Sequence, residues 1–170
     1  RPGDLVFVSG TIGDAGAGLA ALKDEIANLS ASEREVLVSR YQVPSPRLAL
    51  GQALRGIATA SLDVSDGLLA DLGHIAETSG VRLTIDADRI PLSLAFKAAG
   101  ESVLSAVTAG DDYEIAFTTP AARRDEIPQI AERAGTPVTE IGRVEAGKGI
   151  ALLNSSGHEI PVSKKGYRHF

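Results

Sequence analysis

Short apolar runs separated by glycine and polar residues predict the strands of this chain. Residues 4–10 (DLVFVSG) combine β-branched and aromatic side chains and end in glycine, whereas residues 81–86 (VRLTID) alternate between apolar and polar positions. Residues 111–117 (DDYEIAF) contain another run of this kind. Further strands are expected just before Asp63 and at 138–147, 149–154 and 159–163.

Amphipathic segments with helical spacing fill most of the intervals between the predicted strands. Ser30 and Glu33 form a capping-box pattern at the start of one helix, and the prolines within 41–56 end that helix and open another. Further helices are expected at 19–29, after Asp66, from about 93 to 107 and at 121–135, where Pro128 predicts an irregularity. In the helix after Asp66, one apolar stripe is predicted to comprise Leu68, Leu69, Leu72, Ile75 and Ala76. Because strands and helices alternate without a repeat or a linker, we expect a single α/β domain.

Composition narrows the class of protein. A chain of 170 residues with 44% hydrophobic content can bury a sizeable core. The net charge of −5 and the scattered basic residues argue against a nucleic-acid partner. The absence of cysteine excludes disulfides, a thiol nucleophile and thiolate metal sites, which fits a protein of the cytoplasm. No apolar run reaches membrane-spanning length, so no membrane partner is expected. The chain starts at Arg1 and contains no methionine, so we expect it to be a fragment.

Acidic residues gather at one predicted strand-to-helix corner, SLDVSDGLLADLGHI (61–75). Asp63 ends the strand and Asp66 begins the helix, where an aspartate could act simply as an N-cap. A cap does not explain Asp63, and no Lys or Arg occurs from 56 to 81 to balance the two charges. Mg²⁺ prefers oxygen ligands and shares them with phosphates. The corner therefore predicts a metal-bound phosphate site, with a helix cap as the alternative.

Two other segments carry possible chemistry. In TAGDDYEIAF (108–117), the Gly-Asp-Asp part favours a turn, and strand alternation places Glu114 on the face opposite the core, either solvated or against a ligand. In SGTIGDAGAGL (9–19), the Walker lysine is missing. Its glycines would still let the backbone approach an anion or a neighbouring element closely.

Five segments in this order resemble the C-terminal half of thiamine-monophosphate kinases, a branch of the superfamily that includes aminoimidazole ribonucleotide synthetase. They are SGTIGDAGAGL, PSPRLALGQALRG, SLDVSDGLLADLGHI, GDDYEIAF and the terminal GYRHF. The resemblance covers essentially the whole chain. It implies that residues 1–170 form one layered α/β domain of the α+β type, with a mixed β-sheet flanked by helices. This would be the C-terminal domain of a larger two-domain enzyme.

The resemblance also implies an activity, namely ATP-dependent transfer of a phosphoryl group to thiamine monophosphate, which gives thiamine diphosphate. Asp63 and Asp66 would hold Mg²⁺, and Ser65 would contact ATP. No side chain is assigned as catalytic, because an acceptor phosphate is already anionic and the chemistry rests on alignment and charge neutralisation.

Substrate contacts are implied at the second acidic segment and at the chain end. Glu114 would meet the thiamine part of the substrate, together with Tyr167 or, as the other candidate aromatic, Phe170. An N-terminal half would supply further metal ligands, most of the nucleotide site and the interface of a homodimer. Two alternatives stay open. One is a related superfamily enzyme with another phosphate acceptor, and the other is a non-catalytic binding or dimerisation domain whose acidic corners cap helices.

Overall fold

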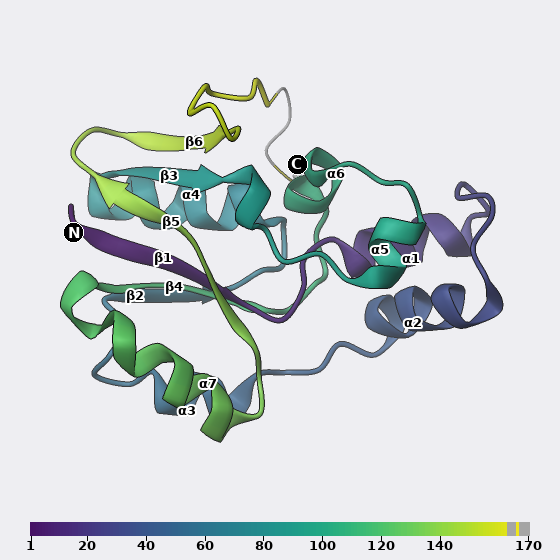
Figure 1. The fold of residues 1–170 in the computed structure, drawn as a ribbon, viewed down its shortest axis with the longest axis horizontal. Coiled ribbons are helices and arrows are strands. Elements are labelled where there is room, and N and C mark those ends of the chain that lie inside the picture. Colours follow the sequence, from purple (N-terminus) through teal and green to yellow (C-terminus); the bar gives the residue numbers. More distant parts are fainter. Residues whose placement is uncertain (163–165, 167–170) are drawn as a thin grey trace.

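A six-stranded mixed sheet forms the centre of the molecule (Figure 1). The structure, a computed structural model, describes residues 1–162 and 166. The strands are β1 (Asp4–Ser9), β2 (Ala60–Asp63), β3 (Arg82–Asp86), β4 (Ile115–Pro120), β5 (Val138–Glu145) and β6 (Gly149–Leu153). They lie in the order β2-β4-β1-β5-β3-β6, in which the β3–β6 pair is parallel and the other pairs are antiparallel. This arrangement confirms the expected layered domain with a mixed sheet.

Helices flank this sheet on both faces, and α1, α2 and α5 form a group that extends past the ends of its strands (Figure 1). The α-helices are α1 (Asp14–Leu22), α2 (Ala31–Gln42), α3 (Leu48–Ala53), α4 (Leu68–Ser79), α5 (Leu94–Ala98), α6 (Val103–Thr108) and α7 (Ile127–Ala134). The 3₁₀ helices are η1 (Ala87–Arg89) and η2 (Ala121–Glu126). Within the part of the chain that the structure describes, no helix is long and apolar enough to cross a membrane.

Strand alternation divides the apolar residues between two cores, one on each face of the sheet. On one face, Val6 and Val8 of β1 belong to the larger core with the buried stripe of α4. As predicted, that stripe comprises Leu68, Leu69, Leu72, Ile75 and Ala76. On the other face, Phe7 stacks on Phe117 with ring centroids 5.3 Å apart, and both contribute to the core beneath α3 and α7. The packing of α4 against the sheet holds the β2–α4 corner in place.

Several predicted elements differ in extent from the observed ones. The prediction of a helix at 19–29 is wrong, because α1 already ends at Leu22 and both Asp24 and Asn28 adopt positive φ. The helix instead begins at Asp14, and its glycines allow close packing: a Cβ at Gly18 would lie 2.1 Å from the Leu37 carbonyl oxygen of α2. Small residues rather than large apolar ones therefore form this contact. The start of the helix consequently lacks the apolar spacing from which a helix is predicted.

Later segments also depart from the predictions in detail. The predicted helix at 93–107 is split into α5 and α6, with Gly100 at φ +72° between them. The segment 121–135 starts as η2 and continues as α7, with Pro128 in the first turn, where a proline is tolerated. Of the strand predicted at 159–163, the described residues show one isolated bridge, between Leu153 and Glu159. The capping box at Ser30 and Glu33 is confirmed.

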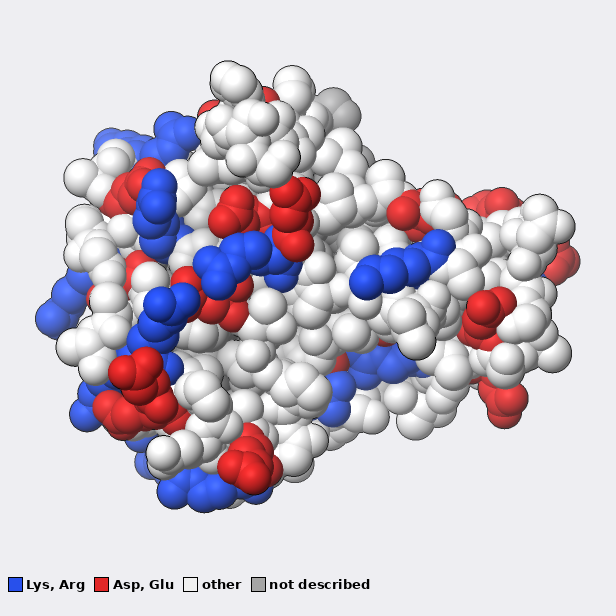
Figure 2. Space-filling model, viewed as in Figure 1, with Lys and Arg blue, Asp and Glu red and all other residues white. Residues whose placement is uncertain are grey.

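Charged side chains of both signs are interspersed on the face shown in Figure 2 rather than gathered into one patch. The ion pairs of the protein include two at Glu140, whose Oε1 lies 3.0 Å from Arg89 Nη1 and whose Oε2 lies 2.6 Å from Arg124 Nε. Surface pairs of this kind contribute little stability, typically below about 1 kcal/mol.

Candidate active site

The two acidic segments singled out in the sequence form one site, because their loops hydrogen-bond to each other through the backbone. Three such bonds join residues 64–65 to residues 111–114: Asp111 N to Ser65 O (2.9 Å), Tyr113 N to Val64 O (2.8 Å) and Val64 N to Glu114 O (2.8 Å). Asp63 ends β2, which pairs with β4 immediately beyond Glu114. The corner that carries Asp63 and Asp66 is thus held against the Gly-Asp-Asp segment.

Glycine permits this close approach of the two loops. A Cβ at Gly110 would lie 2.4 Å from the Ser65 carbonyl oxygen, and Gly67 has φ +119° with the Thr108 carbonyl oxygen 3.0 Å from its hypothetical Cβ. Asp111 (φ 69°) and Tyr113 (φ 50°) also adopt left-handed conformations, which are unfavourable for residues with a side chain. The backbone hydrogen bonds hold these unfavourable conformations in place.

Asp66 does not cap the helix, so the N-cap alternative for this residue is wrong. Helix α4 begins at Leu68, its N-cap is Gly67, and no side chain caps it. Gly67 has a φ that residues with a Cβ avoid. This glycine lies between Asp66 and Leu68, the first residue of the helix. Instead Asp71, inside α4, accepts hydrogen bonds from the backbone N–H groups of Ser65, Asp66 and Gly67.

The pair Asp63 and Asp66 offers hard oxygen donors of the kind Mg²⁺ prefers. Asp63 is exposed at the end of the edge strand β2, and Asp66 is half-buried. Across residues 1–162 and 166, no group of three or more acidic or histidine side chains is arranged to hold a metal ion. The two carboxylates therefore fit Mg²⁺ as part of a ligand set that phosphate oxygens or another protein segment would complete.

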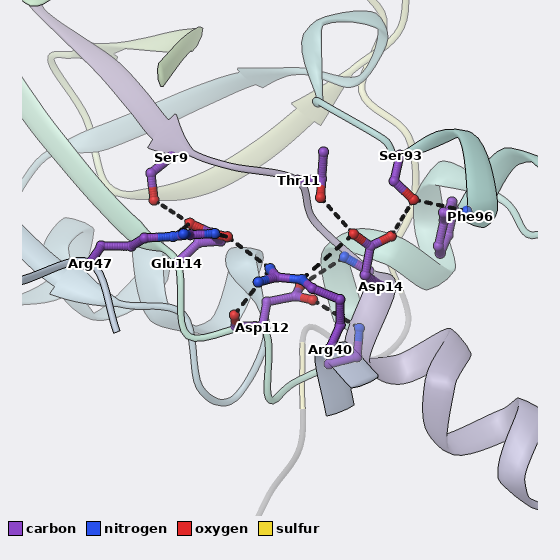
Figure 3. Close-up of polar contacts among 11 residues, drawn as sticks. Ser9, Thr11, Asp14, Arg40, Arg47, Ser93, Phe96, Asp112 and Glu114 are labelled. Carbon is purple, nitrogen blue, oxygen red and sulfur yellow. Dashed lines mark hydrogen bonds and ion pairs between the residues drawn. The ribbon is translucent and has the colours of Figure 1, made fainter. Parts of the chain in front are cut away.

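Beside the corner, Glu114 is the centre of a buried ion-pair cluster (Figure 3). Its carboxylate accepts hydrogen bonds from four donor atoms: Ser9 Oγ (2.5 Å), Arg47 Nε (2.8 Å), Arg47 Nη2 (2.5 Å) and Arg40 Nη2 (2.7 Å). Burial alone would raise the pKa of Glu114, but the hydrogen bonds from Arg47 and Ser9 and the charges of both arginines outweigh it and lower the pKa. Glu114 is therefore an ionised, fully enclosed carboxylate.

The prediction that Glu114 occupies an exposed strand face is wrong. Strand β4 begins only at Ile115, and the positive φ of Tyr113 interrupts the alternation that a strand through 111–117 would have. Glu114 consequently turns toward Ser9 of β1 and toward the arginines of α2 and the α2–α3 connection. Its predicted contact with the thiamine part of a substrate stays a prediction.

Residues of the same cluster hydrogen-bond to the glycine-rich segment that follows β1, within 9–19 (Figure 3). Asp112 accepts hydrogen bonds from the backbone N–H groups of Gly13 (2.7 Å) and Ala15 (3.1 Å). Asp14 accepts from Thr11 Oγ1 and Ser93 Oγ, and its Oδ2 lies 3.8 Å from Arg40 Nε. The glycines of segment 9–19 allowed close approach either to an anion or to a neighbouring element, and the structure shows the second. Two amides of this segment, those of Gly13 and Ala15, already donate to the Asp112 carboxylate.

Burial raises the pKa of Asp112 to about 7, a shift increased by the nearby charge of Asp14 and opposed by the Gly13 and Ala15 amides and by Arg40. A carboxyl group with a raised pKa stabilises the folded state below its unfolded pKa, and this contribution is lost as the pH rises through about 7. We expect the unfolding free energy of wild type, relative to Asp112→Asn, to fall by about 1 kcal/mol per pH unit between pH 4 and 7. Urea denaturation across this range measures the difference.

Asp111→Asn is the matched control, because asparagine tolerates the left-handed conformation of this half-buried neighbour. The unfolding free energy of this variant should keep the fall with rising pH that Asp112 produces in wild type between pH 4 and 7. A constant difference between wild type and Asp112→Asn over the same range would contradict the raised pKa.

Sequence reasoning missed most of the buried cluster. Arg47 and Asp14 belong to this cluster, and Asp71 binds the neighbouring corner. All three lie within the segments that resemble thiamine-monophosphate kinases, and this position was the only sequence feature that indicated a role for them. Arg40 occurs in a mostly exposed helix and carries no such signal.

The terminal motif begins close to the corner. A Cβ at Gly166 would lie 2.5 Å from both the Asp66 carbonyl oxygen and the Ala70 Cβ. Tyr167 and Phe170, the aromatic residues predicted to contact the substrate, lie outside the described residues.

The fold and the joined acidic loops agree with one family of proteins. Residues 1–153 match the family described as AIR synthase related protein, C-terminal domain, so the chain belongs to this family. Among individual relatives, thiamine-monophosphate kinase of Salmonella typhimurium is 39% identical over 175 residues, which cover 100% of this chain and 53% of the relative. The expected resemblance to thiamine-monophosphate kinases is confirmed.

Solved structures show the same relationship. The crystal structure of thiamine-monophosphate kinase from Stenotrophomonas maltophilia superposes with a TM-score of 0.82 and 39% identity over 94% of this chain and 52% of that one. The structure of AaThiL complexed with AMPPCP and TMP has a TM-score of 0.81 and 36% identity over 100% of this chain and 52% of its own. This chain therefore spans about half the length of the curated relatives it matches.

Proposed function

We propose that residues 1–170 are the C-terminal domain of a larger ATP-dependent kinase that phosphorylates thiamine monophosphate to thiamine diphosphate. The observation that carries this proposal is the joining of the two acidic loops into one site, on a chain similar to thiamine-monophosphate kinases along its whole length. AMPPCP is an analogue of ATP, so the AaThiL complex supports ATP and TMP as the two substrates.

In this proposal Asp63 and Asp66 hold Mg²⁺ and Ser65 contacts the nucleotide. When bound, Mg²⁺ supplies neutralisation of the charge on the transferring phosphoryl group. The acceptor is a phosphate oxygen that is already anionic, so the chain needs no side chain to remove a proton. Its contribution is to hold the two carboxylates on a backbone that the neighbouring loop fixes.

Recognition of thiamine is assigned to Tyr167 and Glu114, with Phe170 as the other aromatic candidate. An aromatic face can stack on the aminopyrimidine or meet the cationic thiazolium. Both oxygens of Glu114 are held by Ser9 and the two arginines, so a direct bond to the amino group of thiamine requires an exchange of one of these partners. The family resemblance further supports a homodimer of the full-length enzyme and a cytoplasmic location.

The proposal is tested by assaying thiamine diphosphate formation from ATP, Mg²⁺ and thiamine monophosphate. We expect the full-length enzyme to turn over at about 1–100 s⁻¹, as kinases commonly do, and the isolated 170 residues to show negligible activity. The reason is that the described residues do not complete a metal site.

Two results would contradict this proposal. Turnover by the isolated chain close to that of the full-length enzyme would mean that the metal site is complete here. No thiamine diphosphate from a folded full-length enzyme, tested with alternative phosphate acceptors in parallel, would assign a different substrate.

A further inference from the structure

Asp71 lies in the first turn of α4, and its carboxylate points back to the acidic corner. A single oxygen, Oδ2, accepts hydrogen bonds from three consecutive backbone N–H groups, those of Ser65 (3.0 Å), Asp66 (3.0 Å) and Gly67 (3.2 Å). The residue is only 5% exposed. A buried carboxylate thus sits at the point where three amides of the corner converge.

Successive backbone N–H groups that converge in this way form a concavity suited to an anion. Here the acceptor is a carboxylate of the protein itself. Burial raises the pKa of Asp71 and the three amides oppose this rise, because hydrogen bonds to an ionised acceptor are about twice as strong as neutral ones. These three amides are therefore not available to a substrate phosphate. They serve to hold the loop that carries Ser65 and Asp66.

The opposite edge of the same loop is held as well. The carbonyl oxygens of Val64 and Ser65 accept hydrogen bonds from Tyr113 N and Asp111 N of the neighbouring segment. The loop is consequently fixed through its N–H groups by Asp71 and through its carbonyl groups by the Gly-Asp-Asp segment. Asp71 is the one of these two supports that acts through a side chain, so it can be changed by substitution.

We propose that Asp71 is a positioning residue, which sets the backbone of Ser65 and Asp66 so that Asp66 can act as a Mg²⁺ ligand. This role rests on the function proposed above. Asp71 itself would touch neither metal nor substrate, because its carboxylate is buried against the three amides.

The test compares Asp71→Asn with wild type in the full-length enzyme, using two readouts that need no turnover. The first is hydrogen exchange of the peptide covering residues 64–70 without metal, measured by mass spectrometry. The second is the dissociation constant of Mg²⁺ in the presence of AMPPCP, measured by calorimetry. We expect exchange about tenfold faster at the three amides and a dissociation constant raised by about tenfold, because asparagine lacks the charge that holds the loop.

Glu77→Gln is the matched control, because it removes one carboxylate from the exposed side of the same helix. It should leave both readouts at their wild-type values. If Asp71→Asn does not fold, Asp71→Glu keeps the charge but displaces it by one methylene, and it is expected to shift both readouts in the same direction.

Unchanged exchange at 64–70, or faster exchange with an unchanged dissociation constant of Mg²⁺, would overturn the role of Asp71. Asp63→Asn separates this failure from a failure of the proposed function. If Asp63→Asn weakens Mg²⁺ binding and Asp71→Asn does not, only the positioning role is wrong. If neither variant affects Mg²⁺ binding, the metal corner itself is wrong.

Discussion

Asp63→Asn or Asp66→Asn in the full-length enzyme is expected to lower kcat by a factor of about 100 to 1000, the range found when one group that stabilises transition-state charge is removed. For Asp63→Asn, stability should change by less than about 1 kcal/mol, since Asp63 is exposed and lies outside α4. Steady-state kinetics over a Mg²⁺ titration measure the first quantity, and urea denaturation measures the second.

Asp88→Asn is a suitable control for the loss of one negative charge, because Asp88 is exposed in η1, away from the corner in sequence. Its kcat and Mg²⁺ dependence should equal those of wild type. If Asp63→Asn keeps both the rate and the Mg²⁺ dependence of wild type, Asp63 is not a metal ligand.

Glu114→Ala is expected to destabilise the domain by about 3–5 kcal/mol, the range found when one partner of a buried ion pair is removed. The substitution leaves the guanidinium groups of Arg40 and Arg47, whose side chains are 18% and 22% exposed, without the carboxylate that neutralises them. It also removes the acceptor to which the Ser9 hydroxyl donates. Urea denaturation of the isolated 170 residues gives the free energy of unfolding directly.

Glu140→Ala provides a matched comparison, because Glu140 also pairs with two arginines, Arg89 and Arg124. Those arginines are 44% and 57% exposed and can return to water, so the loss should stay below about 1 kcal/mol. Should Glu114→Ala be as stable as wild type while its affinity for thiamine monophosphate falls, Glu114 would be primarily a substrate contact and the structural role would be wrong.

Local patterns were sufficient to predict much of the framework. A run of β-branched and aromatic residues ending in glycine identified β1, and alternation identified β3. The spacing of apolar residues identified the buried stripe of α4, and Ser30 with Glu33 identified the start of α2. The end of a strand at Asp63 was also predictable. Each of these features depends on residues that are close together along the chain, within one or two helical turns or one strand. The local sequence therefore contains all of the residues that decide it.

Other features depend on backbone conformations that distant contacts impose. Tyr113 adopts a positive φ although its type disfavours it, and this change turned Glu114 away from the exposed face that alternation predicted. Asp66 was expected to begin the helix, but the N-cap is Gly67. The backbone of Gly67 has a positive φ and lies close to the Thr108 carbonyl oxygen. Neither outcome follows from the local residue types.

The environment of the acidic residues was decided by the tertiary structure alone. Glu114 meets Ser9, Arg40 and Arg47 across 105, 74 and 67 residues of chain. Asp112, which reads as an ordinary turn residue, binds the amide of Gly13 across 99 residues. The sequence by itself determined which carboxylates the chain carries and on which elements, because these are local properties. Only the packing of strands and helices from distant parts of the chain decided which carboxylates are buried against arginines and amides and which one, Asp63, remains exposed at the corner.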